Sequence, residues 1–125
     1  MKIKSTSFKD LKIINSPIYS DKRGNFREIF QAKFFKKIKF VFSCMSVSKK
    51  NVLRGMHIQT NFSQGKHLSV IKGEIFDVAI DLRKNSKTFG KYFKIKLSEK
   101  NGTSIYIPPG FAHGFVGLKK ENIIY

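Results

Sequence analysis

The stretch E-I-F-D-V-A-I-D-L, from Glu74 to Leu82, decides the fold class of this chain. Every second residue in it is apolar, from Phe76 to Leu82, while the residues between them include two aspartates. A period of two predicts an extended strand whose successive side chains point to opposite sides. One face would carry Phe76, Val78, Ile80 and Leu82, and the other would carry Ile75, Asp77, Ala79 and Asp81.

Shorter stretches of the same kind occur along the whole chain. Their spacing of ~8–12 residues, with glycine, asparagine and lysine turns between them, predicts an all-β jelly-roll sandwich or barrel. We expect one short helix over Gln31–Ile38, with Phe34, Phe35 and Ile38 on one face. The expected strands are Lys2–Thr6, Leu11–Tyr19, Asn25–Phe30, Val41–Ser48, Val52–Gln59, Leu68–Ile71, Glu74–Leu82, Tyr92–Leu97, Ser104–Ile107, His113–Val116 and Asn122–Tyr125.

The bulk properties predict one domain over residues 1–125. The single cysteine, Cys44, cannot form an internal disulfide and is typical of a reducing compartment. The chain does not open on a secretory leader, and no apolar run reaches ~18 residues. We therefore expect a soluble cytoplasmic protein that does not act at a membrane.

The formal net charge of +17 would attract a polyanion such as nucleic acid. Arginine, the residue that grips phosphate and guanine with two hydrogen bonds, is scarce, and the lysines are scattered through every segment. A nucleic-acid binder remains an alternative, but the composition favours a protein without a nucleic-acid partner. The four arginines are Arg23, Arg27, Arg54 and Arg83.

His57 lies in a strand-like run and is either a structural residue or a general base, because imidazole titrates near neutral pH. Strict alternation places it on a face with Gly55 and Gln59. Arg54 would then lie on the other face, unless Gly55 marks a bulge that re-aims one of the two side chains.

Two aspartates share a face of the Glu74–Leu82 strand, about 13 Å apart at ~3.3 Å per residue. That separation is too long for a paired acid and base, so each carboxylate needs a partner from elsewhere. We expect Asp81 to pair with Arg83 or a turn lysine. Asp77, in mid-strand, is costly to bury alone and is the better candidate for orienting a histidine.

His113 follows a Pro-Pro-Gly corner, and the run from Gly102 to His113 fits the spacing of the second cupin motif, G-x5-P-x-G-x2-H. Cupins that bind metal also need a paired H-x-H and a glutamate. His57 has no such neighbour and His67 adjoins Lys66, so we expect no catalytic metal. Lys66 itself is either a surface lysine or a cation beside a developing enolate oxygen.

Five strings together resemble the dTDP-4-dehydrorhamnose 3,5-epimerase family, from about Ile14 to Tyr125. They are D-K-R-G-N-F-R-E (Asp21–Glu28), R-G-M-H-I-Q (Arg54–Gln59), Q-G-K (Gln64–Lys66), F-D-V-A-I-D-L-R (Phe76–Arg83) and I-P-P-G-F-A-H-G-F (Ile107–Phe115). The resemblance implies a cupin-like jelly roll, a homodimer that exchanges N-terminal strands, and no cofactor. It also implies that C3 and/or C5 of a dTDP-4-keto-6-deoxy sugar is epimerised through an enolate.

The resemblance also implies roles for individual residues. The catalytic positions are His57 as base, Tyr125 as acid, Lys66 near the C4 oxygen, and Asp77. The substrate-binding positions are Arg23, Phe26, Glu28, Arg54, Gln59 and His113, with Arg23 and Arg54 on the diphosphate or sugar and Phe26 and Glu28 contributed across the dimer interface.

Three departures from the family pattern support a second hypothesis. Phe42–Ser43–Cys44 stands where the family has Q-x-N, the family's C-terminal segment with the aspartate that orients the histidine is lacking, and Tyr125 is the last residue. Loss of an orienting carboxylate can lower the rate by several orders of magnitude. The alternative is therefore a catalytically weak or inactive cupin that binds a nucleotide sugar.

Overall fold

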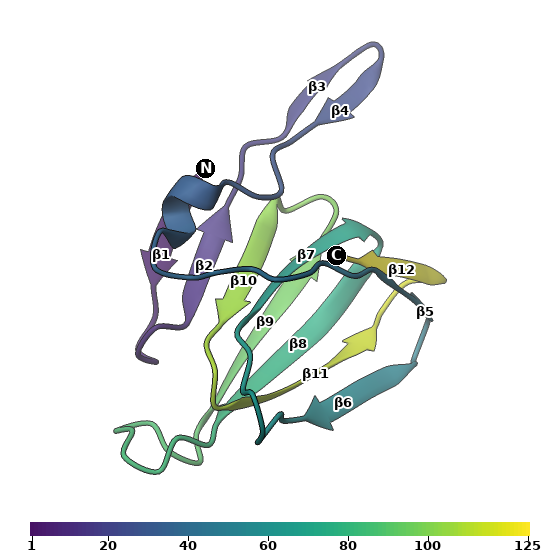
Figure 1. Ribbon diagram of the computed structural model, residues 1–125. Coiled ribbons are helices and arrows are strands. Elements are labelled where there is room, and N and C mark those ends of the chain that lie inside the picture. Colours follow the sequence, from purple (N-terminus) through teal and green to yellow (C-terminus); the bar gives the residue numbers. More distant parts are fainter.

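The computed structural model describes all residues from Met1 to Tyr125. Strands make up almost all of the regular structure, as Figure 1 shows. The elements are β1 (Lys2–Ser5), β2 (Lys12–Asn15), β3 (Tyr19–Asp21), β4 (Gly24–Phe26), the 3₁₀ helix η1 (Ala32–Phe35), β5 (Ser46–Lys49), β6 (Leu53–His57), β7 (Lys66–Lys72), β8 (Glu74–Asp81), β9 (Tyr92–Ser98), β10 (Thr103–Ile107), β11 (Phe111–Gly117) and β12 (Glu121–Ile124).

Two antiparallel sheets form the body of the protein. One has six strands in the order β1-β2-β10-β7-β12-β5, and the other has four in the order β6-β11-β8-β9. The main hydrophobic cluster draws side chains from both sheets, among them Val70, Ile105 and Ile75. This arrangement confirms the expected all-β sandwich, and below we call the side of each sheet that faces this cluster its inner face.

The β8 strand shows why the alternation of Glu74–Leu82 was informative. Ile75, Asp77, Ala79 and Asp81 are all buried, whereas Phe76 on the other face is 36% exposed. The apolar residues alone do not distinguish the two faces, because both carry them. Contact with the six-stranded sheet selects the face that holds the two aspartates.

A second, smaller cluster lies on the outer face of the six-stranded sheet. It joins Phe35 of η1 to Ile14 and Tyr106, with Phe34 and Ile38 packed against it. The predicted apolar face of this segment is thus confirmed, but the regular helix covers only Ala32–Phe35 rather than Gln31–Ile38. No helix in the structure is long and apolar enough to cross a membrane.

Three predicted strands are markedly shorter than expected. The strand predicted over Leu11–Tyr19 ends at Asn15, and a separate strand, β3, begins at Tyr19. The strand predicted over Asn25–Phe30 ends at Phe26, because the chain then leaves its hairpin and Arg27 donates hydrogen bonds to the β7 strand, at Ser69 Oγ and Val70 O. The strand predicted over Val41–Ser48 begins only at Ser46, which is the residue opposite Ile124 at the end of β12, so the residues before it lack a ladder partner.

Candidate functional site

A buried histidine–aspartate pair lies on the inner face of the four-stranded sheet. His113 of β11 and Asp77 of β8 are 7% and 0% exposed, and His113 Nε2 is 2.7 Å from Asp77 Oδ2. The two strands are neighbours with Phe115 opposite Asp77 and Ala79 opposite His113, so the pair forms along a diagonal of the ladder.

Asp77 therefore orients a histidine, as its mid-strand position predicts, and that histidine is His113. Because a carboxylate oxygen faces Nε2, this nitrogen carries the hydrogen and donates it, and Nδ1 is the nitrogen left for other contacts. The second oxygen of Asp77, Oδ1, is buried and has no hydrogen-bond partner.

Asp81 pairs with Arg83, as expected. The Arg83 guanidinium donates to both carboxylate oxygens at 2.9 and 2.8 Å, and its Cζ atom lies 4.7 Å from the centre of the Phe111 ring. Burial alone would raise the pKa of Asp81, but hydrogen bonds from Arg83, Ser86 and Thr88 hold it well below its ordinary value. These contacts make Asp81 a structural anchor for the loop after β8.

A bulge in β6 determines where His57 and Arg54 lie. His57 is opposite His113 and Arg54 is opposite Phe115, so three residue steps on β6 match two on β11. Residues directly opposite each other share a face, and the bulge therefore places both Arg54 and His57 on the inner face with His113. Strict alternation is thus wrong for this strand, and the structure has the alternative, a bulge at Gly55 that places Arg54 and His57 on the same face.

Only glycine fits at position 55. Its φ is +113°, and a Cβ atom there would lie 2.6 Å from the Cα of Gly114 on the neighbouring strand. The motif R-G-M-H thus has its glycine because the bulge requires close contact with β11.

His57 differs from His113 in its surroundings. It is the last residue of β6, an edge strand of its sheet, and its side chain is exposed. No side chain donates to its ring or accepts from it, whereas His113 has Asp77. His57 is accessible to a substrate, and the orienting carboxylate belongs to its neighbour.

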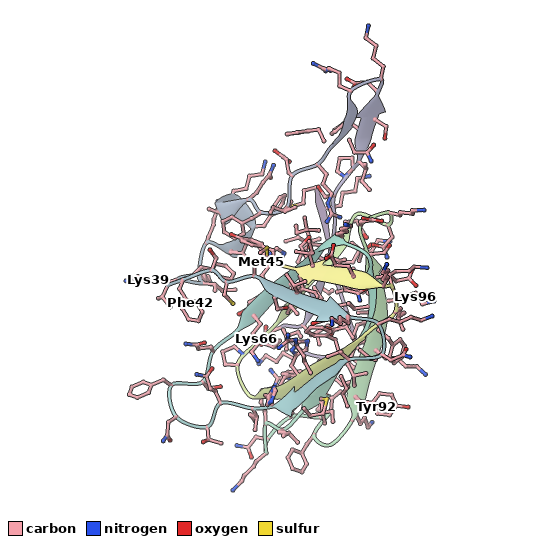
Figure 2. The ribbon with its side chains drawn as sticks, turned by 90° about the vertical axis from the view of Figure 1, so that its right-hand side faces the viewer. Lys39, Phe42, Met45, Lys66, Tyr92 and Lys96 are labelled. Carbon is pink, nitrogen blue, oxygen red and sulfur yellow. The ribbon has the colours of Figure 1, made fainter.

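Lys66 begins β7 on the face that carries the core residues Leu68 and Val70. It is half-buried and forms no ion pair. In Figure 2, Lys66 lies near the centre of the view, while Lys39 and Phe42 lie at one edge of the molecule and Tyr92 and Lys96 at the other. Lys66 is thus distinct from the exposed lysines of the surface.

Tyr125 is less well placed than the sequence suggests. Its backbone forms two hydrogen bonds with Ser69, of 2.8 and 2.9 Å, which extend the pairing of β12 with β7. The side chain is 37% exposed, and its phenol has no hydrogen-bond partner. The structure brings neither Tyr125 nor Gln59 into hydrogen-bond contact with His57.

Three predicted substrate-binding residues lie away from this group in the same chain. Figure 1 shows the β3–β4 hairpin extending from the body of the protein. Arg23 pairs there with Asp21 at 2.7 Å, and Phe26 is 66% exposed. Glu28, just after the hairpin, accepts a hydrogen bond from Gln31.

The substituted segment before β5 is also open to solvent. Phe42 is 63% exposed, and Ser43 and Cys44 are exposed as well. They lie outside any strand, so the structure does not place them against His57 or His113.

Two polar residues near Arg54 were missed in the sequence. Arg54 donates to Ser48 Oγ at 2.8 Å, and the Ser48 carbonyl accepts from Asn122 Nδ2 at 3.1 Å. A weak signal was available in S-V-S-K, where alternation puts Ser46 and Ser48 on one face. Asn122 gave none, because its hydrogen bonds to Ser48 and Glu74 join segments that are distant in the sequence.

A family model described as dTDP-4-dehydrorhamnose 3,5-epimerase matches residues 5–125. The chain belongs to this family. The family member from Methanothermobacter thermautotrophicus is 46% identical over 95% of this chain and 66% of its own length, and that from Shigella flexneri is 42% identical over 97% and 70%. The chain spans about two thirds of the length of these family members.

Solved structures of family members have the same fold. The Legionella pneumophila epimerase, in complex with dTDP-4-keto-L-rhamnose, has a TM-score of 0.92 and 45% identity over 98% of this chain and 68% of its own. The Sulfolobus tokodaii enzyme has a TM-score of 0.88 and 43% identity over 100% and 74%. These structures confirm the cupin-like jelly roll and the family resemblance.

Proposed function

We propose that the chain epimerises C3 and/or C5 of a dTDP-4-keto-6-deoxy sugar, as an isomerase of dTDP-rhamnose-type biosynthesis. The observation that carries this proposal is the inner-face group of His57, Arg54 and His113 with its buried partner Asp77. Membership of the epimerase family supports the same activity, and one solved relative is described as a complex with a dTDP-4-keto sugar.

The reaction needs a base beside a carbon next to a ketone. The exposed imidazole of His57 takes the proton from that carbon, the C–H electron pair forms a C=C bond, and the carbonyl electrons move to the C4 oxygen. A cation there stabilises the enolate, which is the role we assign to Lys66. Return of a proton to the opposite face of the carbon, assigned to Tyr125, completes the inversion.

His113 is assigned to the substrate rather than to proton abstraction. Its hydrogen bond to Asp77 fixes the ring orientation and tautomer, so that Nδ1 is the nitrogen available for a sugar oxygen. Gln59, exposed just beyond β6, is assigned to the same substrate.

Deuterium exchange tests the activity directly. In D2O, the chain should incorporate deuterium at C3 and/or C5 of dTDP-4-keto-6-deoxyglucose, and His57→Ala should lower the rate by ~10²-fold or more, because it removes the base. A rate for the unsubstituted chain no higher than that of His57→Ala would rule the activity out.

The hairpin supports the proposal of a homodimer with exchanged N-terminal strands. Tyr19 and Phe26 are 61% and 66% exposed on an arm that leaves its own body, so Arg23, Phe26 and Glu28 would reach the site of a second copy. Mixing inactive His57→Ala with inactive Arg23→Ala should then restore part of the activity, because one site of each mixed dimer has both residues. No restoration would place the arm at its own site.

A binding protein without turnover is the second candidate. It is favoured by the absence of a carboxylate on His57 and of any hydrogen bond to the Tyr125 phenol. Calorimetric binding of the nucleotide sugar, together with no deuterium incorporation, would establish this alternative over the epimerase.

A further inference from the structure

Arg54 reaches from the edge of one sheet to the edge of the other. It lies on β6, and its guanidinium donates from Nε to Ser48 Oγ at 2.8 Å and from Nη2 to the Val47 carbonyl at 3.1 Å, both on β5. Nε and Nη2 form one edge of the planar guanidinium, and the hydrogen bonds to β5 use the donors of that edge.

The rest of the guanidinium is available to a ligand. A guanidinium has five N–H donors, and two are used here, so three remain on Nη1 and Nη2. The Arg54 side chain is exposed, and its remaining fork has the geometry that binds phosphate oxygens with two parallel hydrogen bonds.

Ser48 is held by a second buried residue. It is 3% exposed, and its carbonyl accepts from Nδ2 of Asn122, which is 0% exposed. Asn122 Nδ2 also donates to the Lys119 carbonyl at 2.8 Å, and Asn122 Oδ1 accepts from the amides of Glu74 and Lys119, both at 3.1 Å.

The Asn122 side chain is therefore fully paired and links β12 to β5 and to the start of β8. Its packing is close: a Cβ atom at Gly117 would lie 2.5 Å from Asn122 Nδ2. A side chain with all its hydrogen bonds made in a buried site has a fixed orientation, and so does the strand it holds.

We propose that Ser48 and Asn122 are positioning residues for Arg54. Asn122 fixes Ser48, and Ser48 fixes the Nε edge of the guanidinium, so that the opposite fork is presented to the diphosphate of a nucleotide sugar. The inference rests on the proposed function for the identity of the ligand. Beyond that function, we infer that Ser48 and Asn122, which do not touch the ligand themselves, determine the affinity of Arg54 for the diphosphate.

The experiment measures binding of dTDP and of inorganic pyrophosphate by calorimetry. Ser48→Ala should weaken both by about tenfold, because the guanidinium loses an anchor and must be ordered by the ligand. Ser48→Cys keeps the volume of the side chain but offers a weak acceptor, and it should reproduce the loss with less disturbance of packing. Ser48→Thr keeps the hydroxyl and should rescue affinity.

Ser69→Ala is the matched control. Ser69 is also a buried serine, 2% exposed, whose hydroxyl accepts from an arginine, Arg27 Nη2, at 3.3 Å. It lies on β7, away from the guanidinium of Arg54. Its loss should leave both affinities unchanged, which separates positioning from a general cost of removing a buried hydroxyl.

A double-mutant cycle distinguishes a positioning role from a structural one. Arg54→Lys removes the Nε donor, so Ser48→Ala should have no further effect on pyrophosphate binding in that background. An equal loss in both backgrounds, unchanged affinity of Ser48→Ala and Ser48→Cys, or no binding of either diphosphate by the unsubstituted chain would overturn the inference. Ser48-dependent binding without deuterium exchange would overturn only the proposed activity.

Discussion

Two histidines, one buried and one half-buried, lie on opposite faces of the jelly roll, and their environments differ. His113, between the sheets, bonds to the carboxylate of Asp77 at 2.7 Å. His67, on the outer face of the six-stranded sheet, bonds only to the hydroxyl of Ser104 at 3.0 Å and lies against the rings of Phe30 and Phe35.

The comparison shows how one residue type serves two purposes. Burial lowers the pKa of His67 to about 4, so its ring is neutral at physiological pH and acts as a packing element. His113 is hydrogen-bonded to a carboxylate, and it lies opposite the accessible His57. The inner face brings His113 and its carboxylate partner beside the accessible His57, whereas His67 has only a hydroxyl and aromatic rings around it.

The largest effect on stability is expected from breaking the hydrogen-bonded pair of His113 and Asp77, called the inner pair below. Asp77→Ala should lower the free energy of unfolding by about 4 kcal/mol, because it leaves a buried histidine without its partner. Urea denaturation at pH 7.5 measures this. Asp21→Ala, which breaks an exposed pair on the hairpin, is the control and should leave the midpoint unchanged. Equal effects of the two substitutions would contradict the distinction between buried and exposed pairs.

A somewhat smaller effect is expected from opening the outer cluster. Phe35 is 5% exposed and contacts Phe30, Phe40 and Tyr106. Phe35→Ala should lower the free energy of unfolding by about 3 kcal/mol, because a cavity remains beside the sheet. The contacts of Arg54 with Ser48 and Val47 should survive, so anion binding by the folded variant should be unchanged. Loss of that binding would show that the two faces are not independent.

Lowering the pH tests whether the His67 ring must be neutral for the fold to be stable. The pKa of His67 is lower in the folded chain than its ordinary value of 6.5, so its contribution to stability is complete above pH 6.5 and is lost as the pH falls toward 4. Between pH 7.5 and pH 4.5 this should cost about 2.5 kcal/mol of unfolding free energy. His67→Gln does not titrate and should show a smaller loss over this interval. Identical pH profiles would contradict the assignment to His67.

The smallest effect is expected at an exposed ion pair. Lys72 and Glu121 lie 2.8 Å apart, with side chains 59% and 49% exposed. Lys72→Met should leave the urea midpoint unchanged within error. Solvent screens the attraction, and the entropy lost in ordering the two long side chains offsets what remains. A clear decrease at low salt that disappears at high salt would show that the pair contributes more than its exposure predicts.

Much of the strand structure could be predicted because alternation is a local property. Glu74–Leu82 and Tyr92–Leu97 alternate and are strands in nearly those bounds. The predictions that were too long, Leu11–Tyr19, Asn25–Phe30 and Val41–Ser48, fail where a strand lacks a neighbour. The local sequence of a strand does not determine which residues of another strand it pairs with. Ser46 is the start of β5 because Ile124 lies opposite it.

The candidate site divides in the same way. The residue types of acid–base chemistry, the glycine of R-G-M-H and the need of Asp77 for a partner were all evident from the sequence, because chemistry and burial cost belong to individual residues. Which histidine Asp77 bonds, and that Ser48 and Asn122 hold Arg54, were decided by the tertiary structure. These contacts join residues 36, 6 and 74 positions apart, and only the register of the strands sets such distances.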